Sequence, residues 1–218
     1  MEFDLSERSE AWRTKLQSFF DREVLPRHRA WLEHTARSRE TPPFMADLQQ
    51  KARDAGLWNL GLPELADDEP GTRLSNLEYA PLAEIMGRLF WVSEVFNCQA
   101  PDVPNMIALQ NCATPEQKAR WLRPLLEAKT RSAFGMTEPD VASSDATNIA
   151  TRMVRDGDDY IINGRKWFIT GAAHPRCSFL IVMGVTDAEA DRTRRHSCII
   201  VPMEAPGVRL VRSLRWMG

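Results

Sequence analysis

The sequence predicts an α+β protein, with helices first and strands second, on three observations. Apolar residues at helical spacing and helix-start signals occupy the first part of the chain. Short apolar runs separated by turn dipeptides occupy the rest. The two kinds of segment do not alternate, which argues against a βαβ fold. We expect an all-α helical bundle at residues 1–130, then a small antiparallel β-barrel domain at residues 131–218 that is incomplete at its C-terminal end.

Capping signals mark the helix boundaries of the first domain. Ser6 precedes apolar residues at helical spacing, and Pro26 should kink or end that helix. A second helix is expected through "PFMADLQQKARDAG" and should stop at Gly56, which suits the left-handed position beyond a helix end. The segments "SNLE" and "TPEQ" are capping boxes that begin at Ser75 and Thr114. Further helices are expected through "FWVSEVFN" and "DVPNMIALQNCA".

Most of the tryptophans lie in these helical segments. We expect them to pack in a core, because packing explains their positions more simply than an aromatic binding face does. They are Trp12, Trp31, Trp58, Trp91 and Trp121.

Turn dipeptides and apolar runs define the second domain. "DGDD" at 156–159 and "NG" at 163–164 are expected to be hairpin turns, because Asp-Gly and Asn-Gly tolerate positive φ. The runs "SFLIVMGV" and "HSCIIVPM" are typical of strands that fill a small barrel, and "VRLVR" predicts one more strand. The polar segment "TDAEADRTRR" is expected to be a solvated loop.

Charge and composition exclude several classes of function. The chain has 28 basic and 30 acidic residues, so no basic surface for nucleic acid or an anionic membrane is expected. The start "MEFDLSERSE" lacks the features of a signal or transit peptide, and no apolar run approaches membrane-spanning length. We therefore expect a cytoplasmic protein. The four cysteines form no CxxC pair and no HExxH motif occurs, so we expect reduced thiols and no metal site.

Two stretches carry a possible ligand site: "FGMTEPDVASSDAT" and "NGRKWFITGAAHP". The first offers backbone amides and the hydroxyls of Thr137, Ser143 and Ser144, which suit an anionic or hydrogen-bonding ligand. The second has Trp167, Phe168 and Thr170 at the end of an expected hairpin strand. An aromatic ring and a hydroxyl two residues apart share one face of a strand. From the residues alone, an Asp/Ser turn and an amphipathic hairpin without a ligand are the favoured interpretation, because such compositions are common in loops.

Taken together, the two stretches resemble the acyl-CoA dehydrogenase family of flavoproteins. The middle β domain of that family carries a "TEP…SD" loop and a "K-x-W-[IS]-[TS]" strand. The segments "NCQAPDVPNM", "TPEQKARWLRPLLE", "YIINGRKW" and "HSCIIVPMEAPGV" are similar to the branch that contains animal members ten and eleven. The resemblance covers nearly the whole chain.

The resemblance implies FAD at the β domain, with a fatty acyl-CoA between flavin and helices. In this family a carboxylate removes the α-proton while the β-hydrogen leaves as hydride to flavin N5, which yields a trans-2-enoyl-CoA. The motif match assigns donors near flavin N1 and O2 to the Met136 backbone and the Thr137 hydroxyl. It assigns a contact near N5 to Thr170, and the ring contact to Phe168.

The full cofactor set implied by the resemblance has eight members. They are Phe134, Met136, Thr137, Ser143, Ser144, Phe168, Ile169 and Thr170. Ser144 is expected to meet the FAD pyrophosphate and also to lie near the CoA end of the substrate.

Two departures from the family pattern affect this set. The loop reads "PDVASSD" where many relatives have "PGAGSD", which bears on the pyrophosphate contacts of Ser143. Phe168 stands where most relatives have Trp, so the flat ring remains but the indole donor is lost.

No catalytic residue is expected in this chain, because the family's catalytic glutamate lies in a C-terminal helical domain that is absent from it. The resemblance gives Glu138 a structural role. We therefore expect an incomplete copy of a longer enzyme that is inactive alone, in preference to half of a split enzyme or a non-catalytic remnant.

The predicted function is that of an FAD-dependent acyl-CoA dehydrogenase that passes electrons to an electron-transferring flavoprotein and assembles as a dimer or tetramer. Two alternatives stay open. One is an acyl-CoA oxidase or flavin monooxygenase of the same fold. The other is a non-catalytic flavin-binding or assembly subunit.

Overall fold

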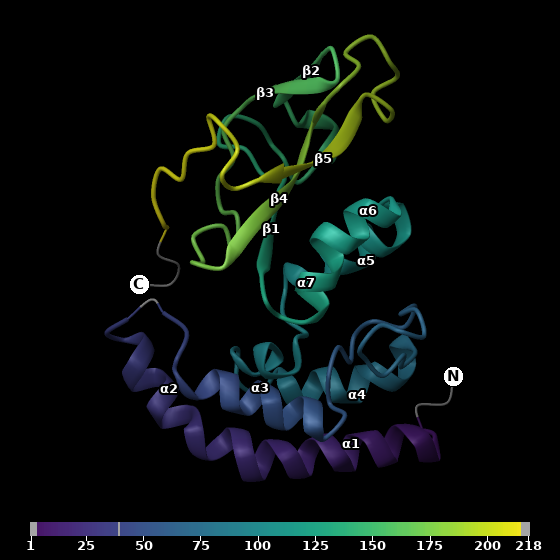
Figure 1. Cartoon of the computed structure of the whole chain (residues 1–218), viewed down its shortest axis with the longest axis vertical. Helices are drawn as coiled ribbons and strands as arrows, with labels where there is room; N and C mark the ends of the chain where they lie inside the picture. Colours follow the sequence, from purple (N-terminus) through teal and green to yellow (C-terminus); the bar gives the residue numbers. More distant parts are fainter. Residues whose placement is uncertain (1–3, 39, 215–218) are drawn as a thin grey trace. The chain divides into compact units, whose positions relative to one another are not determined.

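The computed structural model describes residues 4–38 and 40–214 of the chain. The chain divides into two compact units, Met1–Ala128 and Lys129–Gly218, here called the helical unit and the strand unit (Figure 1). The α+β class predicted from the sequence is confirmed.

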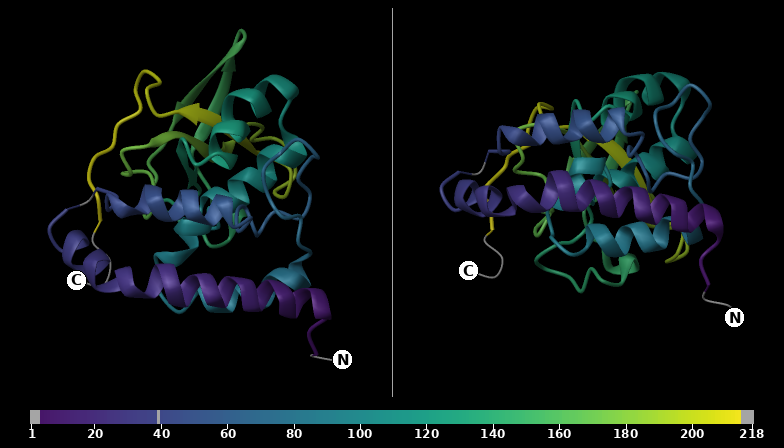
Figure 2. Two further views of the ribbon diagram at one scale, coloured as in Figure 1. Left: turned by 60° about the horizontal axis from the view of Figure 1, so that its bottom comes forward. Right: turned by 90° about the horizontal axis from the view of Figure 1, so that it is seen from below.

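The helical unit begins with one long helical path that bends partway along. α1 (Glu7–Phe19) continues through a π-helical turn and a 3₁₀ turn into α2 (His28–Thr35), and Figure 2 shows this curved path in purple and blue. Ser6 caps α1, because its hydroxyl accepts a hydrogen bond from the Ser9 backbone N–H at 3.1 Å. Pro26 lies in the 3₁₀ turn, so the predicted break in the helix is confirmed.

The other helices follow the predicted start and stop signals closely. They are α3 (Phe44–Asp54), α4 (Asn76–Met86), α5 (Asp102–Cys112), α6 (Pro115–Gln117) and α7 (Arg123–Leu126). Both capping boxes are present, and Gly56 has the expected positive φ of 66°. The segment "FWVSEVFN" forms only a 3₁₀ turn at Val92–Phe96, which ends at a left-handed Asn97.

A single hydrophobic core holds the helical unit together. Its largest buried side chains include Leu16, Phe20, Leu48, Leu82 and Phe96. Trp58 and Trp91 are buried in this core, while Trp12 and Trp31 pack against it from the side. Trp121 is half-buried beneath the Arg120 guanidinium, which lies 4.5 Å from its ring centroid. Core packing is therefore confirmed for Trp12, Trp31, Trp58 and Trp91, whereas Trp121 is not among the residues of this core.

The strand unit contains one five-stranded sheet. Its strands are β1 (Arg131–Gly135), β2 (Arg152–Asp156), β3 (Asp159–Asn163), β4 (Cys177–Val185) and β5 (His196–Pro202). β4 pairs with β1 and β5 along most of its length, and touches β2 at Val185. The turn at 156–159 closes the predicted β2–β3 hairpin, with Gly157 at φ 62°. The expected loop "TDAEADRTRR" connects β4 to β5.

The prediction that the strands are all antiparallel is wrong, and the predicted closure of the sheet into a barrel is not observed among the described residues. β1 and β2 both run parallel to β4, so the sheet is mixed. Parallel pairing requires a long crossover, and the chain between β1 and β4 provides one. Among the described residues the sheet stays open, because the ladder contacts of β1 and of β5 are with β4.

Two further strand predictions are also wrong. The segment "VRLVR" at 208–212 is not part of the sheet, and Leu210 and Val211 are exposed. The "NG" at 163–164 ends β3 without starting a hairpin, so the segment through Trp167 and Thr170 is a loop.

Among the described residues, no helix is both long enough and apolar enough to cross a membrane. Within the same part of the chain, no group of three or more His, Cys, Asp or Glu side chains could hold a metal ion.

Candidate functional site

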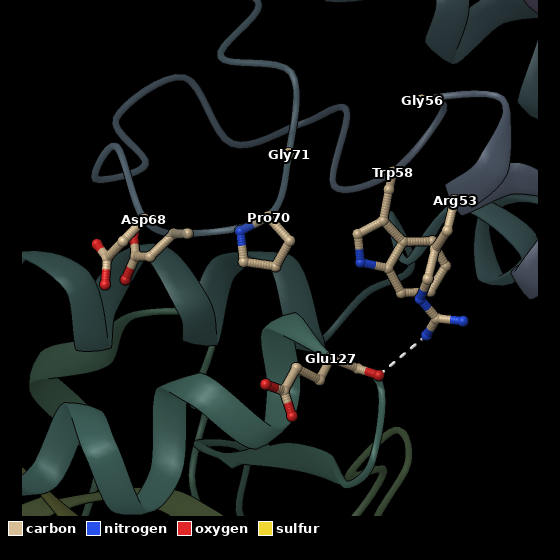
Figure 3. Close-up of a pocket in the computed structure, with 8 residues that line it drawn as sticks. Arg53, Gly56, Trp58, Asp68, Pro70, Gly71 and Glu127 are labelled. Carbon is tan, nitrogen blue, oxygen red and sulfur yellow. Dashed lines mark hydrogen bonds between the residues drawn. The ribbon is translucent and has the colours of Figure 1, made fainter.

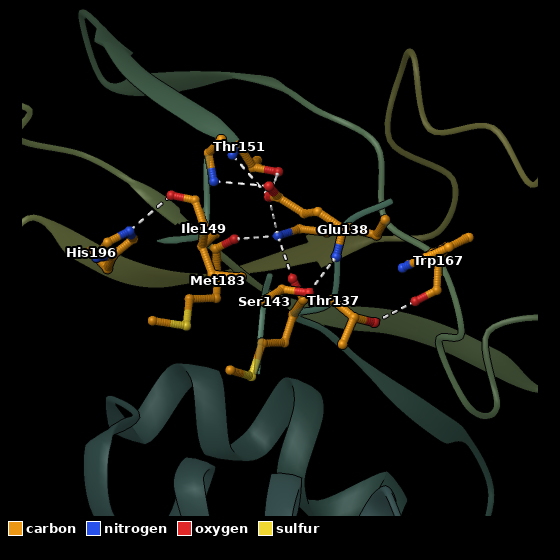
Figure 4. A network of polar contacts seen from close by, with 11 residues as sticks. Thr137, Glu138, Ser143, Ile149, Thr151, Trp167, Met183 and His196 are labelled. Carbon is orange, nitrogen blue, oxygen red and sulfur yellow. Dashed lines mark hydrogen bonds and ion pairs between the residues drawn. The ribbon is translucent and has the colours of Figure 1, made fainter. Parts of the chain in front are cut away.

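The two stretches singled out in the sequence lie side by side in the strand unit (Figure 4). The Trp167 backbone N–H donates to the Thr137 carbonyl at 3.1 Å, and the Thr137 hydroxyl donates to the Trp167 carbonyl. This reciprocal pair joins residues 30 positions apart in sequence. The loop that leaves β1 and the loop that leaves β3 therefore form one continuous surface.

A buried lysine connects the same two loops beneath that surface. Lys166 Nζ donates to the Met136 carbonyl, the Met183 carbonyl and Glu138 Oε1, each at 2.8 Å. An ammonium group has three donors, so this set satisfies it fully. The Lys166 side chain is only 12% exposed. It therefore ties the loop after β1 to strand β4.

Glu138 is the acidic partner of this lysine and is itself buried. Its carboxylate accepts the backbone N–H groups of Ala150 and Thr151 at 2.8 Å each, and also the Thr151 hydroxyl. Burial by itself raises the pKa of Glu138, but the hydrogen bonds from Lys166, Thr151 and Ala150 outweigh burial and hold that pKa at about 2. Glu138 is thus ionised, and both of its carboxylate oxygens accept hydrogen bonds, in line with its expected structural role.

Gly164 packs closely against Thr151. A Cβ atom at this position would lie 2.2 Å from Thr151 Oγ1 and 2.8 Å from Thr151 Cβ. Only glycine allows the backbone of this segment to approach Thr151 so closely. The glycine therefore serves close packing against the partner of Glu138.

The predicted cofactor residues differ in exposure. Ser144, Phe168 and Thr170 are exposed; Phe134, Met136, Thr137 and Ile169 are half-buried; Ser143 is buried. The Ser143 hydroxyl accepts the Glu138 backbone N–H at 3.1 Å, so it stabilises the loop from inside. The Met136 N–H bonds the Phe134 carbonyl at 3.2 Å. The exposed hydroxyls of this set are thus those of Ser144 and Thr170.

Two exposed aromatic rings adjoin the Thr137 pair. The Trp167 and Phe168 ring centroids lie 4.7 Å apart, and the side chains are 42% and 61% exposed. Phe168 also has a φ of 51°, a left-handed conformation that is unfavourable for a residue with a bulky side chain. Exposed rings on a strained backbone are typical of a ligand surface.

The far end of the loop is held by charged side chains. Asp145 caps the short turn at 146–148, and Arg192 Nη2 donates to Asp145 Oδ2 at 2.9 Å and to Asn148 Oδ1 at 3.0 Å. His196 Nε2 bonds the Ile149 carbonyl at 3.0 Å. Ser144 therefore precedes a segment that is fixed at both ends.

Two surface cavities lie elsewhere, in the helical unit. Their volumes are about 530 and 220 Å³, and they share Asp68, Glu69, Pro70 and Glu127. In the larger one, Arg53 stacks 3.7 Å above the Trp58 ring and donates to the Glu127 carbonyl at 3.0 Å (Figure 3). None of the eight predicted cofactor residues lines either cavity.

The arrangement is suited to binding a flat ligand more than to acid–base chemistry. It offers rings, hydroxyls and backbone groups, while its one buried carboxylate is held ionised by four donors. No sequence pattern indicated the roles of Lys166 and Thr151 or the close approach of Gly164. Lys166 lies inside a recognised motif, but no local pattern distinguishes it from the exposed Arg165 beside it.

Comparison with protein families identifies both halves of the chain. Residues 6–129 match the N-terminal domain of acyl-CoA dehydrogenases, and residues 133–218 match the middle domain of the same enzymes. The chain is 47% identical to acyl-CoA dehydrogenase family member 11 of Gallus gallus, over 94% of this chain and 26% of the relative. It is also 47% identical to the Mycobacterium tuberculosis protein named probable acyl-CoA dehydrogenase FadE2, over 100% of this chain and 53% of the relative.

Solved structures agree with this assignment. A structure from Mycobacterium abscessus matches with a TM-score of 0.92 and 50% identity, over 99% of this chain and 55% of the other. An acyl-CoA dehydrogenase from Geobacillus kaustophilus matches with a TM-score of 0.69 and 27% identity, over 93% and 50%. The chain thus spans about a quarter to a half of the length of these relatives.

Proposed function

Because the chain belongs to the acyl-CoA dehydrogenase family, we propose that its strand unit binds the FAD of an enzyme that dehydrogenates fatty acyl-CoA thioesters at the α and β carbons. The observation that carries this proposal is the reciprocal pair of hydrogen bonds between Thr137 and Trp167. It brings both predicted flavin-contact segments onto one surface. The product of this reaction would be a trans-2-enoyl-CoA.

The residues at this surface fit a flavin. The rings of Trp167 and Phe168 offer an exposed apolar face, and the exposed hydroxyls of Thr170 and Ser144 offer polar contacts. FAD, when bound, would supply the acceptor for the hydride. Ser144 would meet the pyrophosphate and the CoA end of the substrate.

Some donors of the proposed set are engaged within the protein. The Thr137 hydroxyl has one hydrogen, which it donates to the Trp167 carbonyl, and the Met136 N–H bonds Phe134. Donation from Thr137 to flavin would require an exchange of partner. Ser143 would act by shaping the loop, because its hydroxyl is bonded to the Glu138 N–H.

We propose no catalytic base among the described residues. Glu138 lies closest to the site in sequence, but its carboxylate accepts four hydrogen bonds and has a pKa of about 2. A base with so low a pKa would be a poor proton acceptor near neutral pH. We propose that the proton-abstracting carboxylate belongs to a part of the enzyme outside these 218 residues. We also propose an electron-transferring flavoprotein as the electron acceptor and a homo-oligomer as the assembly.

The proposal is tested by flavin binding and by flavin reduction. The protein is titrated with FAD while flavin fluorescence is followed, and saturated acyl-CoA is then added without oxygen. We expect FAD binding that weakens in Thr170→Val but not in Thr193→Val, a control in the exposed loop at 186–195. In the complete enzyme, acyl-CoA should reduce the flavin and thereby bleach its visible absorption band.

Other outcomes of this test point to the alternatives. Absence of FAD binding would overturn the flavoprotein proposal and favour an assembly subunit. Bound FAD that the complete enzyme never reduces would indicate a non-catalytic flavin-binding protein. Rapid reoxidation of the reduced flavin by oxygen would favour an oxidase or monooxygenase.

A further inference from the structure

Lys166 is the residue at which separate segments of the strand unit converge. Its ammonium bonds one carbonyl in the loop after β1, one carbonyl in β4, and the Glu138 carboxylate. Glu138 in turn holds the backbone at Ala150 and Thr151, just before β2. This one ion pair thereby joins strand β4 to the β1–β2 connection and the β3–β4 connection.

The same lysine adjoins both proposed flavin-contact segments. It bonds the carbonyl of Met136, the residue before Thr137, and it directly precedes Trp167 in the chain. Thr137 directly follows Met136, whose carbonyl Lys166 binds, and Trp167 directly follows Lys166 itself. Both members of the Thr137–Trp167 pair are therefore sequence neighbours of this contact. A shift of the ammonium would move both segments relative to each other.

Removal of this ammonium would take one donor away from each of three acceptors. Two are backbone carbonyls and one is a carboxylate that is 6% exposed. The loss of a donor is costly to an acceptor unless the acceptor moves to reach water or another donor. The acceptors here belong to the loop and to β4, so the expected movement lies at the proposed flavin surface.

On the premise that the proposed function is correct, we propose that Lys166 and Glu138 form a positioning clamp for the flavin. The pair does not touch the cofactor. It fixes the Met136–Thr137 backbone against the Trp167–Thr170 segment, so that the exposed rings and hydroxyls face the flavin together. Lys166 is thus a positioning residue, and its contribution is to FAD affinity and to the environment of the flavin ring.

The chain offers matched controls for this clamp. Arg165 is the neighbouring cation, but it is exposed and pairs with the exposed Asp140 at 3.4 Å. Phe179 on β4 is fully buried and lies outside the clamp, so Phe179→Leu weakens the strand unit without altering the ion pair. Lys166→Arg keeps the charge but brings a larger, planar group into a site built for an ammonium.

The experiment measures FAD affinity, the visible circular dichroism of bound flavin, and the thermal unfolding of the flavin-free protein. It compares Lys166→Met, Lys166→Arg, Arg165→Met and Phe179→Leu in the full chain as expressed. We expect Lys166→Met to bind FAD about tenfold more weakly or worse, with an altered flavin spectrum. Lys166→Arg should not restore affinity. Arg165→Met and Phe179→Leu should keep the wild-type affinity and spectrum, although Phe179→Leu unfolds at a lower temperature.

Two results would overturn the clamp. One is an unchanged affinity and spectrum in Lys166→Met; the other is an equal loss in Phe179→Leu, which would mean that stability alone controls FAD binding. If Lys166→Met does not fold, Thr151→Val takes its place in the experiment. This variant removes one Glu138 donor and retains the side-chain shape. Thr151→Val should weaken FAD binding and alter the spectrum, and unchanged values would again overturn the clamp. Failure of the wild-type protein to bind FAD would instead contradict the proposed function.

Discussion

At the scale of single residues, Glu138 shows how a buried charge is stabilised in this protein. Four donors surround its carboxylate, and one of them is the ammonium of Lys166. Burial lowers the pKa of Lys166, against the raising effect of Glu138. The carboxylate itself stays ionised, because its donors outweigh the cost of burial.

This ionisation predicts how stability depends on pH. The pKa of Glu138 falls from 4.5 to about 2 on folding. A lowered pKa means that the stabilisation is fully present above pH 4.5 and is lost as the pH falls from there through the folded value. The contribution at neutral pH is on the order of 3 kcal/mol. Urea unfolding at pH 7 and at pH 3 should show this loss in the wild type.

Glu138→Gln is the variant that tests this assignment. Its free energy of unfolding should be lower than that of the wild type at pH 7. The difference should shrink at pH 3, because the wild-type carboxylate then contributes less to stability. Asp140→Asn, an exposed acid of the same loop, serves as the control and should leave the pH dependence intact. Equal pH dependence in Glu138→Gln and the wild type would show that another acid is responsible.

At the scale of elements, the loop at 164–170 depends on a close approach between two backbones. Its first residue, Gly164, packs against Thr151, which lies just before β2. The Val185 N–H donates to the Thr151 carbonyl at 2.7 Å, and this bond joins the same point to the end of β4. Thr151 thereby connects the loop, the hairpin and the central strand.

A methyl group at Gly164 should disrupt this junction. In Gly164→Ala the new Cβ would meet Thr151 Oγ1 at 2.2 Å, so one of the two segments must move. We expect a loss of about 1–3 kcal/mol in the free energy of unfolding, measured by urea denaturation. Gly157→Ala is the matched control, because its Cβ has open space and only the positive φ of 62° opposes it. Its cost should be about 1–2 kcal/mol.

The two glycine variants also differ in their effect on the Glu138 site. Gly164→Ala should alter the amide resonances of Thr151 and Ala150 in NMR spectra, whereas Gly157→Ala should alter only the hairpin turn. Unchanged resonances at Thr151 in Gly164→Ala would contradict the close approach.

At the scale of the whole molecule, each unit has buried apolar side chains of its own. The helical unit has a continuous core that includes Leu16, Leu48 and Phe96. The strand unit buries Ala133, Met153 and Phe179. The stability of the helical unit therefore depends on burial more than on surface ion pairs, which contribute little individually.

Two leucines test this dependence. Leu48 on α3 is fully buried, whereas Leu77 at the start of α4 is 80% exposed. Leu48→Ala should lower the free energy of unfolding by about 2–5 kcal/mol, because it leaves a cavity in the core. Leu77→Ala should change it by less than about 0.5 kcal/mol. Chemical denaturation followed by far-ultraviolet circular dichroism measures both, and similar losses would contradict the burial of Leu48.

The features that the sequence determined by itself are local ones. The capping boxes at Ser75 and Thr114 and the left-handed Gly56 depend on residues a few positions apart, so their patterns are readable directly. The motifs around Thr137 and Thr170 likewise indicate the family, and the match of residues 133–218 to its middle domain confirms this. The contacts of the eight predicted residues with a cofactor remain predictions.

Only the tertiary structure decided how distant segments pair. Strand direction in the mixed sheet depends on the crossover between β1 and β4, and the fate of "VRLVR" depends on whether a partner edge is available. The Lys166 side chain is largely enclosed because its ammonium contacts Glu138 and Met183, which lie 28 and 17 positions away. Arg165, its neighbour in the chain, lacks these contacts and is exposed. Such contacts are fixed by packing between segments, and no periodicity within either segment encodes them.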